Sequence, residues 1–230
     1  MMMKRGDKGV GVKHVQEWLS LHGYAVTLDG SYGPATEAAV SKFQNANSIP
    51  ATGNVDDATM AALCSPLTRA MAKMPPYASI AQTVVAVAVK HLAERPREVG
   101  GQNMGPWCRA YMDEHEGDAW PWCAGFVWTV VHQATSLFGI KPPIKKTYSC
   151  TELGKSSALL QAPHPSIAPG AIFLLRKKGG GHMHTGIVTK VEKEFYETIE
   201  GNTNDAGERE GIAVMARIRG FKNTDFIAIA

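Results

Sequence analysis

A duplicated segment near the N-terminus limits the fold more than any other feature of this sequence. Residues 29–36 (DGSYGPAT) return 23 positions later as residues 52–59 (TGNVDDAT), and each copy leads into an apolar helical pattern. Both copies place a turn glycine first and a helix N-cap next, Gly33 in the first and Asp56 in the second. The repeat therefore predicts a small domain of short helices over residues 1–67, with two similar loops and no convincing catalytic set.

The rest of the chain carries helical patterns first and strand patterns afterwards. Ser79 and Gln82 form a capping box that opens a helix to about Glu94, and further helices fit residues 105–116 and 122–138. Beyond the Pro-Gly pair that follows, short runs rich in Ile, Val and Phe predict strands at residues 171–175, 185–192, 195–200, 211–218 and 226–229. Helices followed by an antiparallel sheet define an α+β fold.

A proline-containing stretch separates these two regions. Residues 68–78 include Pro75 and Pro76, a composition typical of a linker or of a short docked segment. The sequence therefore predicts three parts, namely a helical domain at residues 1–67, a linker at residues 68–78 and an α+β domain at residues 79–230.

Composition narrows the class of protein. The chain has 230 residues, of which 44% are hydrophobic and 20% charged, and this ordinary globular usage excludes disordered and fibrous classes. The net charge of +3 is too small to predict nucleic acid as a partner. The N-terminus, MMMKRGDKG, lacks the apolar segment of a signal peptide, and the most apolar run, residues 80–89, is shorter than a membrane span of about 20 residues. We expect a monomer that is made in the cytoplasm and does not insert into a membrane.

The sharpest chemical signal is the segment WPWCAGFV at residues 120–127. Cys123 follows a Pro-Trp pair and opens an apolar helix, so its thiol lies at the positive end of the helix dipole, beside backbone N–H groups. Such positions lower the pKa of a cysteine from about 8.5 into a range of roughly 3.5–7.5 and favour the nucleophilic thiolate. Because a single buried cysteine is more often a packing residue, the interpretation needs partner residues.

Two histidines supply the partner. The segment GGGHMHTGIV at residues 179–188 leads into a predicted strand, and alternation places His182 and His184 on one face. We predict His184 as the base because it begins the strand itself. The next strand ends at Glu200 and Asn202, which alternation again places on one face. A hairpin register that sets them beside His184 would give the imidazole an acceptor that fixes its ring, with Asn202 as a further polar support.

The first 67 residues resemble a known module. They follow the pattern G-x-x-G-x-x-V-x-x-x-Q-x-x-L-x-x-x-G-Y from Gly6 and the pattern D-G-x-Y-G-x-x-T-x-x-A-V-x-x-F-Q from Asp29. These patterns look like the peptidoglycan-binding domain of cell-wall hydrolases, which is a three-helix module. Because Asp29, Tyr32 and Thr36 line the first turn, we expect them to be the residues that bind the wall.

Residues 79–230 resemble the CHAP family, the cysteine/histidine-dependent amidohydrolases and peptidases. The matching segments are N-x-G-P at 103–106, P-W-C-A-x-F-V at 121–127, P-G-A-I at 169–172, H-x-G-I-V at 184–188 and E-G-N at 200–202. The resemblance implies a papain-like fold of helices packed on an antiparallel sheet, and no cofactor. It also implies four roles: Cys123 as nucleophile, His184 as base, Glu200 as orienting acid and Asn202 as the fourth polar member. Ala171 departs from the family, which usually has Asp there.

A second cysteine competes for the role of nucleophile. Another Pro-Trp-Cys tripeptide ends at Cys108, so either cysteine fits on the tripeptide alone. The amphipathic stretch after Cys108 favours a structural thiol within a helix. Four cysteines are too few for a disulfide scaffold, but a bond between Cys108 and Cys123 would abolish activity, and the sequence leaves this pairing open.

Two metal sites are open as alternatives. His182 and His184 could bind zinc together with Cys123 and Glu200, although no familiar metal spacing occurs elsewhere in the chain. The acidic residues at 113–118 precede the nucleophile, where some CHAP relatives bind calcium. They lack the regular D-x-D-x-D-G loop, which favours a solvated acidic surface.

These patterns together predict a two-domain peptidoglycan hydrolase in which the N-terminal module holds a cysteine amidohydrolase on its polymer. The scissile bond is either the N-acetylmuramoyl-L-alanine amide or an amide within the peptide stem or cross-bridge. The domain pair without a signal peptide resembles a phage endolysin that reaches the wall through a membrane lesion. A bacterial secretion-system effector is the next interpretation. A wall-binding protein with structural Cys and His residues is the alternative from a different class.

Overall fold

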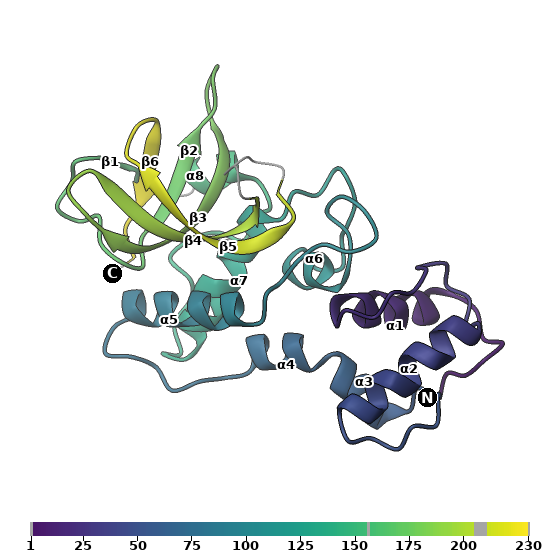
Figure 1. Ribbon diagram of the computed structural model, residues 1–230. Helices are drawn as coiled ribbons and strands as arrows, with labels where there is room; N and C mark the ends of the chain where they lie inside the picture. The colour runs from purple at the N-terminus through teal and green to yellow at the C-terminus, as the bar shows by residue number, and fades with distance from the viewer. Residues whose placement is uncertain (1, 156, 205–210, 230) are drawn as a thin grey trace.

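The computed structural model describes residues 2–155, 157–204 and 211–229 and has the predicted α+β architecture. The helices precede the strands in the described chain, and some of them pack against one antiparallel sheet, as Figure 1 shows. Within the described ranges, the helices are all too short or too polar to cross a membrane.

The N-terminal unit is built from three helices, α1 (Val10–Leu21), α2 (Pro34–Ala46) and α3 (Asp57–Leu63). Both predicted caps are confirmed. Gly33 precedes the proline at the first position of α2, and Asp56 Oδ1 accepts a hydrogen bond of 2.8 Å from the Thr59 N–H at the start of α3. The inward faces bury a small apolar core that includes Val15, Leu19, Val40, Phe43 and Leu63.

Two glutamines explain why the loop sequence is duplicated. Gln16 on α1 accepts a hydrogen bond of 2.8 Å from the Gly30 N–H and donates one of 3.2 Å to Thr36 Oγ1. Gln44 on α2 makes the equivalent contacts, at 2.9 Å with the Gly53 N–H and at 3.0 Å with the hydroxyl of the threonine six residues further on. Each copy of the repeat is therefore a turn that a buried glutamine of the preceding helix ties to the helix that follows.

Six strands of the described chain form one antiparallel sheet in the order β1-β6-β2-β3-β4-β5. They are β1 (Leu160–Gln161), β2 (Ile172–Arg176), β3 (His182–Val191), β4 (Phe195–Thr203), β5 (Ala213–Gly220) and β6 (Thr224–Ile227). Ile187 of β3 lies opposite Ile172 of β2 on one side and opposite Ile199 of β4 on the other. The long strand β3 is thus held between two neighbours in the middle of the sheet.

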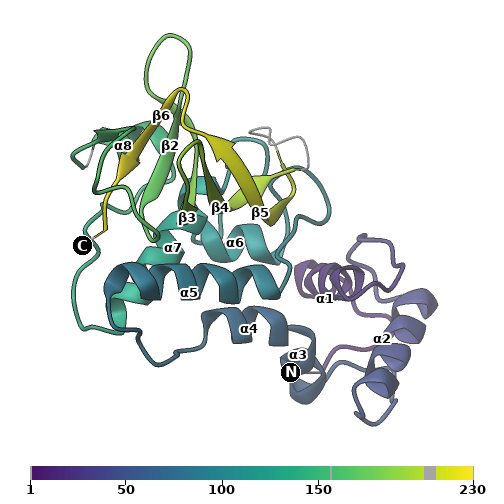
Figure 2. The ribbon, with the colours of Figure 1, turned by 60° about the vertical axis from the view of Figure 1, so that its left-hand side comes forward.

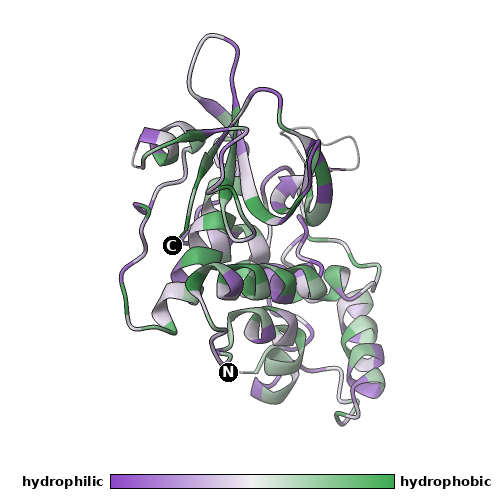
Figure 3. Ribbon diagram, turned by 90° about the vertical axis from the view of Figure 1, so that its left-hand side faces the viewer, coloured by the Kyte–Doolittle hydropathy of each residue, from purple (hydrophilic) through white to green (hydrophobic). Residues whose placement is uncertain are grey.

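Two long helices, α5 (Ile80–Ala93) and α7 (Cys123–Ser136), cover the sheet, as Figures 1 and 2 show. The predicted cap of α5 is confirmed, because Ser79 Oγ accepts a hydrogen bond of 3.2 Å from the Gln82 N–H. Figure 3 shows that both helices are largely apolar. A second apolar cluster, formed by alternate residues of the same strands, includes Phe173, Val188, Tyr196 and Phe226. Both faces of the sheet are therefore apolar, and α7 packs against it at β3 and β4.

The segment between the two units is partly helical. Residues Ser65–Met71 form α4, so the stretch predicted as a linker, residues 68–78, begins inside a helix. Figure 2 shows α4 running beside α5. Arg69 of α4 pairs with Glu94, the residue that caps α5, at 2.7 Å.

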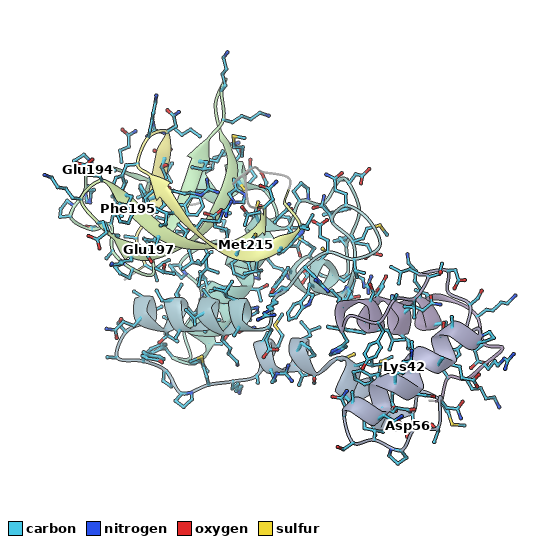
Figure 4. All side chains as sticks on the ribbon, in the orientation of Figure 1. Lys42, Asp56, Glu194, Phe195, Glu197 and Met215 are labelled. Atoms are coloured by element: carbon cyan, nitrogen blue, oxygen red, sulfur yellow. The ribbon has the colours of Figure 1, made fainter. Side chains whose placement is uncertain are left out.

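The N-terminal unit packs directly against the α+β unit. Glu17 of α1 forms a buried ion pair with Arg109 of α6 (Pro106–Tyr111), and the rings of Trp18 and Trp107 meet edge-on with centroids 6.1 Å apart. The far ends of the molecule are seen in Figure 4, where the side chains of α2 and α3 lie on one side and those of the β3–β4 turn lie on the other.

Candidate active site

Cys123 occupies the first position of α7, as predicted, and only 2% of its surface is exposed. Trp122 at the N-cap supplies no side-chain cap, so the first backbone N–H groups of the helix remain available to the thiol. The nearby Cys150 thiol, the His184 imidazole and the Ala124 N–H lower the pKa of Cys123 well below its usual value, although burial acts in the opposite direction. These contacts therefore favour the thiolate form of the sulfur atom.

His184 on β3 is buried, with 1% of its surface exposed, and its Nε2 lies 2.9 Å from Oε2 of Glu200. Its Nδ1 is buried and has no hydrogen-bond partner among the described residues, so it is the nitrogen left for an interaction with Cys123. Burial alone would lower the pKa of His184, but the contacts with Cys123 and Glu200 outweigh burial and raise this pKa to about 9. A lowered thiol pKa and a raised imidazole pKa together favour a thiolate–imidazolium pair.

Glu200 on β4 is completely buried and is surrounded by donors. Its carboxylate accepts hydrogen bonds from His184, from Thr198 Oγ1 at 2.5 Å, and from Nε and Nη2 of Arg219 on β5. Burial would raise the pKa of Glu200, but Arg219 and His184 outweigh it and hold this pKa at about 2. Gly186 makes room for the carboxylate, because a Cβ there would lie 2.9 Å from the Glu200 side chain. Sequence reasoning missed Arg219, since no spacing rule links an arginine on β5 to a carboxylate on β4.

Asn202 lies at the end of the same strand, but its contacts are different. Its φ of 55° interrupts the regular strand conformation, so the alternation expected from the sequence does not carry its side chain to His184. In the amide orientation that satisfies its neighbours, Asn202 Oδ1 accepts a hydrogen bond of 3.3 Å from the Trp122 N–H, and Nδ2 donates one of 2.5 Å to the Gly211 carbonyl oxygen. Asn202 therefore supports the start of α7, one residue before Cys123, and its direct part in the chemistry stays a prediction.

A second thiol, which sequence reasoning missed, reaches the same point. Cys150 begins the short helix α8 (Cys150–Lys155), and its Sγ lies 3.4 Å from the Sγ of Cys123. The separation of 27 residues follows no sequence rule, so only the packing of α8 against α7 reveals the pair. All four cysteines lie within the described chain, and they form no disulfide, including the Cys108–Cys123 bond left open by the sequence.

Cys108 has a different environment. It is completely buried in α6, and its thiol donates a hydrogen bond of 3.4 Å to the Met104 carbonyl oxygen. Burial raises the pKa of Cys108 far above its usual value. A thiol that is held neutral in this way is a packing residue rather than a nucleophile.

His182 faces another carboxylate. Its Nε2 lies 2.9 Å from Oδ2 of Asp225, which also binds Arg176 at 2.7 Å. The register between β2 and β3 shifts between the positions opposite His182 and His184, so the two histidines have separate partners. Over the described ranges, the structure contains no group of three or more His, Cys, Asp or Glu side chains arranged to hold a metal ion.

Two acidic residues of the stretch at 113–118 form ion pairs. Asp113 contacts Lys146 and the hydroxyl of Tyr148, and Glu116 binds Arg109 at 2.6 Å. These carboxylates therefore balance local positive charge.

The three residues expected to bind the wall lie in the first copy of the repeat, Asp29 and Tyr32 in the turn and Thr36 at the start of α2. Tyr32 and Thr36 are buried, with 2% and 3% of their surfaces exposed, and the Tyr32 hydroxyl donates a hydrogen bond of 2.8 Å to the Gly53 carbonyl oxygen. Asp29 is exposed, although its carboxylate accepts a hydrogen bond of 2.8 Å from Gln16. In this conformation only Asp29 of the three is accessible to a polymer, and wall binding by these residues stays a prediction.

Comparison with known families identifies the N-terminal unit. Residues 8–63 match the family described as "Putative peptidoglycan binding domain". The chain therefore carries a peptidoglycan-binding domain at its N-terminus. No curated protein matches the chain.

Several solved structures share a short region with this chain. A fused Zn-dependent amidase/peptidase/peptidoglycan-binding domain-containing protein from Clostridium acetobutylicum is 43% identical over 27% of this chain and 28% of its own, with a TM-score of 0.27. A peptidoglycan-binding protein from Clostridioides difficile is 36% identical over 27% of this chain and 40% of its own, also at 0.27. A Burkholderia AP3 phage endolysin is 26% identical over 39% of this chain and 37% of its own, again at 0.27. This chain thus spans less than half the length of these three proteins.

Proposed function

We propose that this protein is a peptidoglycan hydrolase that cleaves an amide bond with Cys123 as nucleophile, in the manner of a CHAP-type cysteine amidohydrolase. The observation that carries the proposal is the arrangement around Cys123. A buried thiol at the start of α7 meets a buried imidazole, and that imidazole is fixed at 2.9 Å by an ionised Glu200. The peptidoglycan-binding domain at the N-terminus supports the choice of polymer.

The reaction follows from the protonation states of these groups. The Cys123 thiolate attacks the amide carbon, and backbone N–H groups in the first turn of α7 stabilise the negative oxygen of the tetrahedral intermediate. His184, which carries the proton, donates it to the leaving amine. A water molecule then gives a proton to neutral His184 and attacks the thioester, which releases the acid and restores the thiolate. Glu200 keeps the His184 ring oriented throughout and is held ionised by Arg219.

The bond is either the N-acetylmuramoyl-L-alanine amide or an amide of the peptide stem or cross-bridge. We place the activity at the cell wall and propose a role similar to that of a phage endolysin. A secretion-system amidase effector uses the same chemistry and differs in requiring a cognate immunity protein that inhibits it. A wall-binding protein without catalysis would show the same wall-associated behaviour in wild type and in Cys123→Ala, and a thiol-alkylating reagent would change nothing.

The experiment compares wild type with Cys123→Ala on purified peptidoglycan, with the soluble fragments analysed by mass spectrometry. Free glycan strands with intact stems indicate an amidase, whereas split stems or bridges indicate an endopeptidase. We expect Cys123→Ala to lower the rate by about 10³-fold or more while binding to the wall is kept. Cys108→Ala is the matched control, because it removes a buried thiol from the other Pro-Trp-Cys tripeptide. This variant should still cleave peptidoglycan. Equal cleavage by wild type and Cys123→Ala contradicts the proposal.

A further inference from the structure

Two thiols meet in the candidate active site, although the proposed mechanism uses only one of them. The Sγ atoms of Cys123 and Cys150 are 3.4 Å apart, within the distance of a sulfur hydrogen bond and well beyond the S–S distance of about 2.05 Å in a disulfide. Both side chains are buried, at 2% and 7% exposure. The contact is therefore a thiol–thiol contact shielded from bulk water.

The position of Cys150 is fixed by the same strand that carries His184. Thr151, the next residue of α8, binds the backbone of His182 in both directions, because its Oγ1 accepts from the His182 N–H at 3.0 Å and donates to the His182 carbonyl oxygen at 3.1 Å. One turn later, Gly154 packs so closely on the His182 ring that a Cβ there would lie 2.6 Å from it. Helix α8 is thus fastened to β3 two residues before His184, and Cys150 is held at the sulfur of Cys123.

The charges around this contact decide which of the two thiols keeps its proton. When Cys123 is the thiolate that faces the imidazolium of His184, a second thiolate at 3.4 Å would add like charge in a buried space, so Cys150 keeps its proton. Its S–H group can then donate only weakly, but the acceptor is charged, and hydrogen bonds to charged acceptors are the stronger ones.

From this geometry we infer that Cys150 donates its S–H hydrogen bond to the Cys123 thiolate and is a further residue of the catalytic centre. The donor stabilises the nucleophile before substrate binds and fixes the direction of its sulfur relative to the scissile carbon. The hydrogen bond from Cys150 is also the largest of the effects that lower the pKa of Cys123. The inference rests on the proposed function only in taking Cys123 as the nucleophile.

The test measures the thiolate directly, without peptidoglycan. Wild type, Cys150→Ala and Cys150→Ser are alkylated with iodoacetamide across a pH series under a non-thiol reductant, and the rate is read on the Cys123 peptide by mass spectrometry. We expect Cys150→Ala to raise the pH midpoint for alkylation of Cys123 by about one unit, so that alkylation below both midpoints is about tenfold slower. Cys150→Ser keeps a donor and should restore the midpoint. Cys64→Ala, which removes a thiol from the other unit, should leave it unchanged.

A merely structural Cys150 would change stability and leave the midpoint where it is. An unchanged midpoint in a folded Cys150→Ala protein, as judged by circular dichroism, overturns the inference. If the alanine variant does not fold, Cys150→Val fills the space without a donor and is compared with Cys150→Ser in the same way. The two proposals fail differently. An ordinary thiol midpoint for Cys123 in wild type would count against the proposed function, whereas a low midpoint that survives loss of Cys150 counts against this inference alone.

Discussion

Glu200 lies between two cationic groups, and this arrangement fixes the orientation of the His184 ring. A buried carboxylate is costly unless it is paired and hydrogen-bonded, and here Arg219 supplies a two-point contact while His184 supplies a third. The Thr198 hydroxyl donates a further hydrogen bond of 2.5 Å to the Glu200 carboxylate. With its oxygens fixed on several sides, the carboxylate cannot rotate, so the ring of His184 has one orientation.

Replacement of Arg219 by lysine tests this idea. Lysine keeps the charge but cannot form the two-point contact, so we expect Arg219→Lys to stay folded and to lose about tenfold to a hundredfold in kcat, the range typical of groups that orient active-site ligands. The rate of release of soluble fragments from purified peptidoglycan measures the effect. Arg217→Lys is the control, since it makes the same change on the same strand at an arginine that donates a hydrogen bond to the Asn204 carbonyl oxygen, and it should leave kcat unchanged. A similar loss in both variants would show that the strand, not the carboxylate contact, is responsible.

The pH dependence of cleavage should follow the same residues. The pKa of His184 is raised to about 9, so its protonated form is present below that pH and is lost as the pH rises through it. We therefore expect kcat/KM to fall above about pH 9, because neutral His184 has no proton for the leaving amine. The acidic limb should lie well below the usual pKa of a thiol, because the pKa of Cys123 is lowered. Binding to the wall, measured at the same pH values, separates catalysis from attachment. An alkaline limb near the ordinary histidine pKa of about 6.5 would contradict the ion pair.

At the scale of elements, the site depends on how closely β4 approaches α7. Gly201 is the contact point, since a Cβ there would lie 2.6 Å from Phe126 and 2.9 Å from the Trp122 ring. Its neighbours in the chain are Glu200 and Asn202, which contact His184 and the start of α7. The glycine therefore lets one short segment reach both the base and the helix that carries the nucleophile.

Gly201→Ala should disturb this approach. Because the methyl group would meet a buried aromatic side chain, we expect a loss of about 1–3 kcal/mol in the free energy of unfolding, together with reduced cleavage. Gly220→Ala is the matched control, since a Cβ at Gly220, on the neighbouring strand β5, meets nothing within 4 Å. Urea denaturation of both variants gives the comparison, and equal stability of the two would mean that β4 can move away from α7 without cost.

The sequence predicted the long elements of this site well and the short ones poorly. Helix α7 and strand β3 lie within a few residues of their predicted limits, because long apolar patterns leave little choice of period. Helix α8, with six residues, and strand β1, with two, carry too few residues to show any period. Cys150 was missed because α8 was missed, and Arg219 was missed because its partner lies on another strand. Contacts that depend on tertiary packing have no fixed separation in the sequence, so a sequence pattern does not predict them.

At the scale of the whole molecule, the two units are joined by a buried charge cluster. The guanidinium of Arg109 lies between Glu17 of the wall-binding unit and Glu116 of the α+β unit, with a distance of 2.6 Å to the latter. Only 1% of the Glu17 side chain and 10% of the Arg109 side chain are exposed. The peptidoglycan-binding domain is therefore held against the candidate catalytic unit.

Arg109→Met tests how strongly this cluster joins the units. Removal of one partner leaves the carboxylate of Glu17 buried without its cation, so we expect a loss of about 3–5 kcal/mol in the free energy of unfolding, measured by urea denaturation. The double variant Glu17→Gln with Arg109→Met should recover part of this loss, because the almost completely buried side chain of residue 17 then carries no unpaired charge. Arg69→Met breaks an exposed ion pair with Glu94, in which 58% of the Arg69 side chain is accessible, and should cost at most about 1 kcal/mol. Equal small losses for Arg109→Met and Arg69→Met would show that water replaces the buried pair, and that the two units are held together by the contact between Trp18 and Trp107 instead.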